Sequence, residues 1–163
     1  MEAIVAVYSD WGIGDGQTQP VVLSADRVRF REVTRGATVI LGRKTLEDFP
    51  GKRPLKGRRN IILSRNSSDI EGAEVAHSVE EAIKAAENDE KCLVIGGSSV
   101  FNAFFPYLSK VYITKIDCAP DSACFFPDLD SLEDWKCTEE GPLSEENGIK
   151  YRFCIYERIH DYD

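Results

Sequence analysis

The sequence predicts an α/β protein: a three-layer sandwich in which a mostly parallel central sheet of about eight strands carries helices on both faces. Short apolar runs bounded by turn residues alternate with helical patterns along the chain, which is typical of parallel sheets covered on both faces. The last run, residues 151–157, instead alternates apolar and polar side chains after the turn signal Glu146-Asn147-Gly148. The sheet is therefore expected to end in a C-terminal antiparallel hairpin.

The individual elements follow from the same patterns. The expected strands are residues 3–8, 38–41, 60–63, 74–76, 92–95, 111–116, 135–139 and 151–157, and the expected helices are 24–33, 45–49, 79–87 and 98–105. Serines mark three helix starts, because a serine oxygen accepts from the first free N–H groups of a helix. We expect Ser24 to cap the first helix, Ser78 with Glu81 to form a capping box on the third, and Ser98 to open the fourth.

Length and charge limit the domain organisation and the partners. The 163 residues include 28 acidic and 20 basic side chains, a formal net charge of −8. This length predicts a single domain over residues 1–163. The acidic balance argues against a nucleic-acid partner, since phosphate contacts need clustered Lys and Arg.

Other compositional features exclude further classes. No apolar run reaches the roughly 18–20 residues of a membrane helix, and the N-terminus lacks a leader pattern, so a cytoplasmic protein without a membrane partner is expected. The 5 cysteines form no C-x-x-C pair and the 2 histidines lie far apart in the sequence. Neither a disulfide framework nor a metal site is expected.

Strand-to-helix turns are the places to look for a ligand, because open α/β sheets bind ligands beyond the carboxyl ends of their strands. The fifth expected strand ends in Gly96-Gly97 and a helix follows at once. Glycines allow a ligand to approach the backbone, and a helix start offers free N–H groups, which together suit a diphosphate. A tight turn without a ligand is the alternative, because the G-x-G-x-x-G fingerprint is absent.

Two further turns place cations at the same edge. Gly42-Arg43-Lys44-Thr45 repeats the strand-to-helix layout, and Ser64-Arg65 follows the third strand. The two guanidinium groups could hold an adenosine 2′-phosphate, which favours NADP over NAD. Each arginine taken alone could equally be a solvated surface residue.

Asp26 and Arg58 are the remaining candidates. Asp26 shares a helix face with Phe30 and Val33, so it is either a ligand-binding acid in an apolar pocket or a first-turn acid favoured by the helix dipole. Arg58, just before the third strand, either captures a carboxylate or belongs to a solvated charge run. The residues alone leave both choices open.

Taken together, these motifs resemble the dihydrofolate reductase family. The resemblance runs from the first strand to Arg158 and rests on the order of IVAV (4–7), GIG (12–14), GRKT (42–45), RRNIILS (58–64), VIGG (94–97), YITKID (112–117) and FP (126–127), with Leu23, Asp26 and Phe30. It implies NADPH-dependent reduction of 7,8-dihydrofolate to 5,6,7,8-tetrahydrofolate, with hydride transfer to pterin C6 and water-mediated protonation of N5. It also implies inhibition by antifolates, a role in one-carbon metabolism and a monomer.

The resemblance implies roles for individual residues. Asp26 and Thr114 would be catalytic, Asp26 holding the pterin and Thr114 bonded to it. The substrate would be bound by Val5, Ala6, Asp26, Phe30, Phe49, Leu55, Arg58, Ile95 and Thr114, with Arg58 on the α-carboxylate of the glutamate tail. The cofactor would be bound by Ala6, Val7, Ile13, Gly14, Gln19, Gly42, Arg43, Lys44, Thr45, Leu63, Ser64, Arg65, Ile95, Gly96, Gly97, Ser98, Ser99, Val100 and Phe101.

Three departures from the family pattern keep alternatives open. Val21 stands where the family usually has Trp, Phe101 where Tyr is common, and Ala123 where some members have an acid that secures loop closure. Altered kinetics or antifolate sensitivity is the first interpretation. A reductase of the same fold acting on another pterin or on a riboflavin-pathway pyrimidine is the second, and a catalytically weakened NADPH-binding module is the third.

Overall fold

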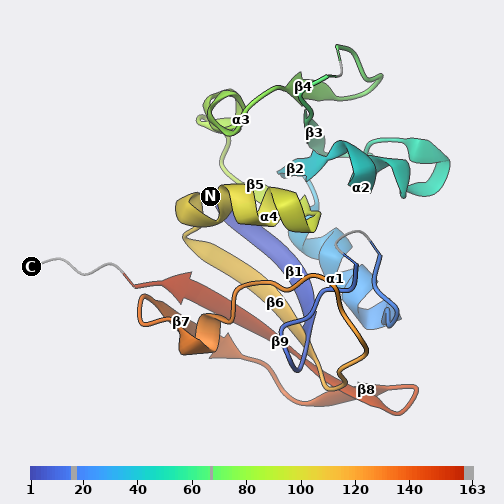
Figure 1. The fold of residues 1–163 in the computed structure, drawn as a ribbon, viewed down its shortest axis with the longest axis vertical. Coiled ribbons are helices and arrows are strands. Elements are labelled where there is room, and N and C mark those ends of the chain that lie inside the picture. Colours follow the sequence, from blue (N-terminus) through green and yellow to red (C-terminus); the bar gives the residue numbers. More distant parts are fainter. Residues whose placement is uncertain (16–17, 67, 160–163) are drawn as a thin grey trace, which may run out of the picture.

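The computed structural model describes residues 1–15, 18–66 and 68–159. These residues form one sheet and the helices around it (Figure 1). The strands are β1 (Glu2–Tyr8), β2 (Thr38–Gly42), β3 (Arg59–Leu63), β4 (Glu74–Ala76), β5 (Cys92–Gly96), β6 (Lys110–Ile116), β7 (Trp135–Glu140), β8 (Ser144–Glu146) and β9 (Ile149–Arg158). The helices are α1 (Ser24–Thr34), α2 (Arg43–Glu47), α3 (Val79–Ala86) and α4 (Ser98–Phe104), with short 3₁₀ turns at Pro50–Lys52, Phe105–Tyr107 and Leu129–Ser131.

The strand order is β4-β3-β2-β5-β1-β6-β9-β7, with β8 beside β9. All pairs from β4 to β6 are parallel, and β9 runs antiparallel to β6, β7 and β8. The predicted mostly parallel sheet with an antiparallel C-terminal hairpin is therefore confirmed. The prediction missed β8, because Ser144, Glu145 and Glu146 show no alternation of apolar and polar side chains.

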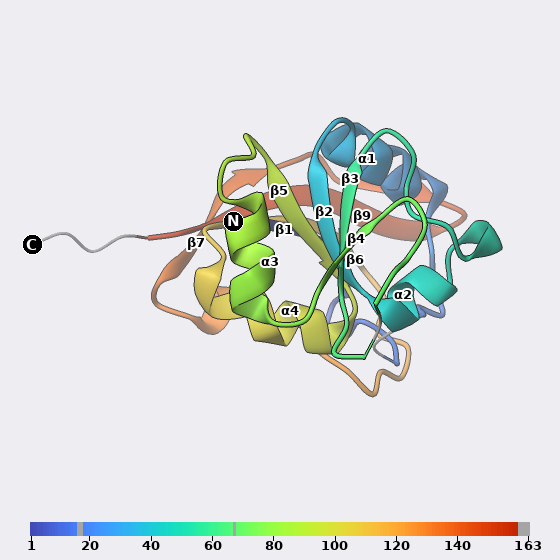
Figure 2. The ribbon, with the colours of Figure 1, turned by 90° about the horizontal axis from the view of Figure 1, so that it is seen from above.

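Helices cover both faces of this sheet (Figure 2). Ala3, Val5 and Val7 of β1 pack in the core cluster that also holds buried side chains of α3 and α4. Ile4, the residue between them in β1, packs in a separate cluster with Phe30 of α1. This division follows from the two-residue period of a strand, and it places α1 on the opposite face from α3 and α4.

The middle of the sheet opens into a crevice. β1 pairs with β5 only at Glu2 and Ala3, whereas β1 stays paired with β6 as far as Tyr8. The carboxyl half of β1 therefore separates from β5, and its backbone groups on that side face a gap. This is the position at which open α/β sheets bind ligands.

Helix starts give two confirmations and two corrections. The Ser78 hydroxyl accepts from the Glu81 N–H at 3.1 Å, so the predicted cap of α3 is confirmed. Ser98 is the first residue of α4, as predicted, and Gly97 is the N-cap. The prediction that Ser24 caps α1 is wrong, because the N-cap residue is Leu23, which contributes no side-chain bond. α2 begins at Arg43 and ends at Glu47, earlier than the predicted 45–49, since Pro50 disfavours a helical Phe49.

The described residues contain neither a helix that could span a membrane nor a cluster of metal-ligating side chains. None of the helices there is long and apolar enough to cross a membrane. In the same residues, no group of three or more His, Cys, Asp and Glu side chains is placed to hold a metal ion.

Candidate functional site

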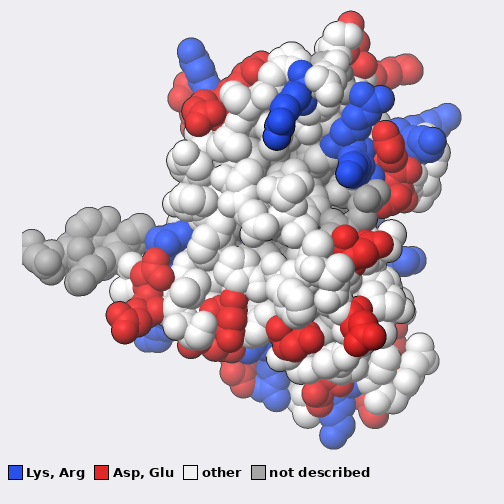
Figure 3. All heavy atoms as spheres, viewed as in Figure 1, with Lys and Arg blue, Asp and Glu red and all other residues white. Residues whose placement is uncertain are grey.

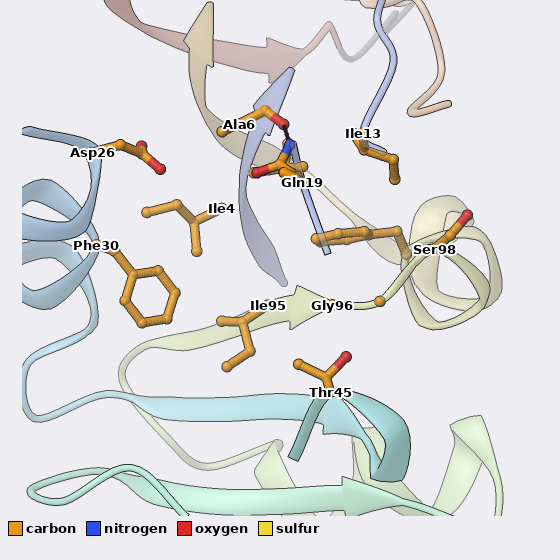
Figure 4. Close-up of a pocket in the computed structure, with 13 residues that line it drawn as sticks. Ile4, Ala6, Ile13, Gln19, Asp26, Phe30, Thr45, Ile95, Gly96 and Ser98 are labelled. Atoms are coloured by element: carbon orange, nitrogen blue, oxygen red, sulfur yellow. Dashed lines mark hydrogen bonds between the residues drawn. The ribbon is translucent and has the colours of Figure 1, made fainter. Parts of the chain in front are cut away.

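The crevice between β1 and β5 is the first of two joined cavities (Figure 4). It is lined largely by aliphatic and aromatic side chains and by glycine backbone, and Asp26 is the one titratable side chain among the described lining residues. The lining is Ile4, Val5, Ala6, Ile13, Gln19, Asp26, Phe30, Thr45, Ile95, Gly96, Gly97, Ser98 and Phe101.

Asp26 reaches the cavity from the first turn of α1. Its carboxylate accepts a 2.5 Å hydrogen bond from the hydroxyl of Thr114, which is buried in β6. Burial raises the pKa of Asp26 above its ordinary value, and this effect outweighs the Thr114 hydrogen bond and the charge of Arg29, which both lower it. The acid thus stands with an elevated pKa at the edge of an apolar cavity, as titratable groups of functional sites often do.

The hydrogen bond from Thr114 makes a prediction about this pKa. Because the bond favours the ionised carboxylate, Thr114→Val should raise the pKa of Asp26 further. Carboxyl-carbon NMR of the ligand-free protein, followed through an acid titration, measures the shift. Ser98→Ala, which removes a hydroxyl from the other end of the cavity, should leave this pKa unchanged. An unchanged pKa in Thr114→Val would mean that the bond does not hold the carboxylate in solution.

Inside this cavity, Gln19 contacts the edge of β1 that is not paired with β5. Its side-chain N–H donates to the backbone carbonyl of Ala6 at 2.8 Å (Figure 4). A buried carbonyl without a partner costs free energy, so the separation of β1 from β5 creates an acceptor that something must satisfy. In this structure the primary amide of Gln19 does so.

The second cavity continues from the first through Thr45 and Gly97, which line both. The starts of α2 and α4 face it, with no side-chain cap on either helix. Its described lining contains cations and hydroxyls but no Asp or Glu: Gly42, Arg43, Lys44, Thr45, Leu63, Ser64, Arg65, His77, Ser78, Val79, Gly97, Ser99, Val100 and Ala103. Lys and Arg side chains gather around α2 on the face shown in Figure 3, although the chain is acidic overall. Helix starts and cations together suit an anionic ligand.

Most residues that the sequence singled out line one of the two cavities, but several do not. Val7 is buried in the core, and Gly14 lines a separate surface hollow beside Ser122 and Ala123. Phe49 and Leu55 pack on the cluster of Val39, Leu41, Leu46 and Ile62, which Ile95 also contacts. Arg58 donates from Nε to the Thr34 hydroxyl at 3.0 Å and from Nη1 to the Lys56 carbonyl at 2.8 Å, outside both linings.

Sequence reasoning also missed lining residues. Ile4 lines the first cavity, although the sequence indicated only its place in a strand. The second cavity is also lined by four residues that were not predicted, namely His77, Ser78, Val79 and Ala103. A signal was available for His77 and Ser78, because they follow β4 and precede α3 in the same strand-to-helix layout as the other two turns.

The structure shows the local contacts of the three residues that depart from the family pattern. Val21 is held through its backbone, since the Tyr8 hydroxyl donates to its carbonyl and accepts from its N–H, both at 3.0 Å. Phe101 packs edge-to-face on Phe126 with ring centroids 5.4 Å apart. At Ala123 the backbone N–H donates to the Gly14 carbonyl at 2.9 Å.

The neighbouring Ser122 supplies a side-chain contact at this place. Its hydroxyl accepts from the Gly14 N–H at 3.2 Å. A hydroxyl next to position 123 therefore contacts the loop that the family's acid would have secured.

The fold and the two joined cavities define an α/β protein with an extended binding crevice at the carboxyl ends of its strands. Its sequence belongs to the dihydrofolate reductase family, whose model, described as "Dihydrofolate reductase", matches residues 1–158. A dihydrofolate reductase of Staphylococcus haemolyticus is 39% identical over 159 residues, which cover 96% of this chain and 94% of the relative. One from Bacillus subtilis is 34% identical over 158 residues, covering 95% and 92%. One from Mycobacterium tuberculosis is 38% identical over 151 residues, covering 90% of each. Family and relatives support an oxidoreductase with dihydrofolate reductase activity.

Proposed function

We propose that this protein reduces 7,8-dihydrofolate to 5,6,7,8-tetrahydrofolate with NADPH, by hydride transfer to pterin C6 and water-mediated protonation of N5. The observation that carries the proposal is the contrast between the joined cavities. Among the described lining residues, the first cavity is largely apolar with Asp26 as its one acid, and the second holds cations and neither Asp nor Glu. Such a pair suits two ligands that meet end to end, one with a flat ring facing the acid and one with phosphates.

The residues present fit NADPH. Arg43 and Arg65 lie at the ends of β2 and β3, where their guanidinium groups would hold the 2′-phosphate. The free N–H groups at the start of α4 would face the diphosphate. Gly96 has a φ of +136°, a conformation that favours glycine and leaves the backbone open to a ligand. When bound, NADPH supplies the hydride.

Asp26 would hold the pterin ring. Its carboxylate can accept two N–H groups from the amidine-like edge of the ring, while the Thr114 hydroxyl fixes its orientation. An acid that is bonded to this edge does not reach N5, so the proton would come through water. Because burial raises the pKa of Asp26, this end of the site retains a proton to a higher pH than an exposed aspartate would.

Arg58 would receive the carboxylate tail of the substrate. Its bonds to Thr34 and Lys56 orient the guanidinium, and they leave other N–H groups for a ligand. Burial, followed by the charges of Arg35 and Arg31, lowers the pKa of Arg58. The repulsion among these three cations would be relieved by an anionic ligand.

The deciding experiment measures the loss of NADPH absorbance with dihydrofolate. We expect turnover, and we expect NADPH at 100 times its Kd to stabilise the protein by about 2.7 kcal/mol. No oxidation at high enzyme concentration would refute the folate reaction. Stabilisation by NADPH without stabilisation by folate or methotrexate would favour the binding module, and oxidation with a ribosylated pyrimidine instead of dihydrofolate would favour the riboflavin-type reductase.

A further inference from the structure

The first turn of α1 needs partners that its own sequence does not supply. A helix leaves its first backbone N–H groups without acceptors inside the helix. The N-cap residue is Leu23, whose side chain cannot accept a hydrogen bond. The Leu23 carbonyl accepts from the N–H groups of Asp26 and Arg27 at 3.1 and 3.2 Å, so the N–H groups of Ser24 and Ala25 remain to be satisfied.

Glu146 satisfies them from the other end of the chain. One carboxylate oxygen accepts from the Ser24 N–H at 2.8 Å and from the Ser24 hydroxyl at 2.9 Å. The other accepts from the Ala25 N–H at 3.0 Å. The two backbone bonds, followed by the hydroxyl bond, lower the pKa of Glu146, so it is ionised at neutral pH. A carboxylate is also the charge that the positive end of a helix favours.

The position of Glu146 ties this cap to the pterin end of the site. Glu146 ends β8, and a turn through Asn147 and Gly148, both with positive φ, leads into β9. β9 pairs with β6, and in this pairing Phe153 of β9 lies opposite Thr114 of β6. This part of the sheet therefore makes two separate contacts with the first turn of α1. Glu146 of β8 accepts from its backbone N–H groups, and Thr114 of β6 donates to the carboxylate of Asp26.

Glu146 binds the two residues that directly precede Asp26 in α1. With Leu23 as the N-cap, Asp26 is the third residue of the helix, so the place of its carboxylate depends on where this first turn lies. We propose that Glu146 is a positioning residue of the pterin site: by capping α1 from the β8–β9 hairpin, it fixes the first turn from which Asp26 reaches the cavity. This inference rests on the proposed function, in which Asp26 binds the pterin.

The test compares Glu146→Ala and Glu146→Gln with the matched control Glu145→Ala, which removes the exposed neighbouring acid of the same strand. In Glu146→Ala, kcat/KM for dihydrofolate should fall roughly tenfold, because small misplacements at a reacting centre are costly. The Kd of NADPH should change by less than about twofold, since its phosphates would bind at α2 and α4. Glu146→Gln should show a smaller loss, and Glu145→Ala should match the wild type.

A second readout separates positioning from a purely structural cap. If the first turn of α1 shifts in Glu146→Ala, the hydrogen bond from Thr114 to Asp26 will weaken, and the pKa of Asp26 will rise because that bond favours the ionised carboxylate. The variant does not alter the other charged group that faces Asp26, Arg29 on the same helix. Carboxyl-carbon NMR of the ligand-free protein measures this pKa without any turnover.

The outcomes are distinct. A less stable Glu146→Ala with unchanged kcat/KM and unchanged Asp26 pKa would overturn the proposal and leave a structural cap. If that variant does not fold, Glu146→Gln decides by the same two measurements. If the wild type does not reduce dihydrofolate, the proposed function fails, while the pKa of Asp26 still tests whether Glu146 controls that carboxylate.

Discussion

Asp26→Asn should lower kcat for dihydrofolate reduction by about 10²- to 10⁴-fold, the range that a positioned acid or base contributes. Asparagine keeps the size of the side chain and one acceptor oxygen, so the cavity retains its shape. It cannot carry the negative charge that would pair with the amidine-like edge of the pterin. The Kd of NADPH should stay within about twofold, because the nearest described cations of the second cavity lie on α2 and β3, away from α1.

Two controls make this prediction sharp. Pre-steady-state measurement with saturating NADPH isolates the chemical step from product release, which limits kcat in many enzymes. Titration of NADPH by protein fluorescence gives its Kd separately. Equal losses of turnover and NADPH affinity would show that Asp26 supports the fold instead of the reaction.

The same substitution should change how stability depends on pH. The pKa of folded Asp26 lies above the ordinary 3.8 of an exposed aspartate. Between these two values the folded state binds more protons than the unfolded state, so the free energy of unfolding falls as pH rises. Asp26→Asn removes that slope and should make the protein more stable at pH 7 than the wild type. Urea unfolding at pH 4 and pH 7 checks this, and a less stable variant at pH 7 would contradict it.

The second large effect is expected in the choice between NADPH and NADH. Arg43→Ala and Arg65→Ala should each weaken NADPH binding by roughly 10- to 100-fold, since a hydrogen bond to a charged group contributes about 1.5–3 kcal/mol. NADH lacks the 2′-phosphate, so its Kd should change little. The ion pair of Arg43 with Glu47, at 3.4 Å on an exposed helix face, adds little to this balance.

Arg53→Ala is the matched control, because Arg53 is an exposed arginine outside the second cavity. It should leave the preference for NADPH unchanged. Raising the salt concentration should reduce the preference in the wild type, as charge interactions near a surface are screened. An unchanged preference in both cavity variants would refute the assignment of the 2′-phosphate to these arginines.

Local patterns in the sequence predicted the sheet well. The runs around Val39, Ile61 and Val94 are apolar over a strand length and end in turn residues, so their position in a buried parallel sheet follows from their own side chains. The glycine turn at Gly96 and the cations at Arg43 and Arg65 were likewise visible, because each directly follows one of these strands.

Features that depend on distant partners could not be predicted in this way. Ser24 precedes a helix and is followed by an acid, which indicates a local cap, yet the cap comes from Glu146, 122 positions away. The sequence left the role of Arg58 open, and it could not show that the Thr34 hydroxyl on α1, 24 positions away, orients the guanidinium. β8 is too short and too polar to be recognised, and it forms because β9 offers it a backbone edge.

The hydrogen bond from Gln19 to Ala6 affects which part of NADPH would contribute the free energy of binding. Ala6 of β1 is among the residues expected to bind the cofactor, and its carbonyl already accepts from a primary amide of the protein, the chemical group that the nicotinamide end of NADPH carries. The cofactor would exchange one amide for another of the same chemistry, with no net gain in hydrogen bonds. The nicotinamide end would then contribute orientation and ring burial. The phosphate end, where Arg43, Lys44 and Arg65 line the second cavity, would contribute most of the affinity. The chain would hold its cofactor by one end and align it by the other.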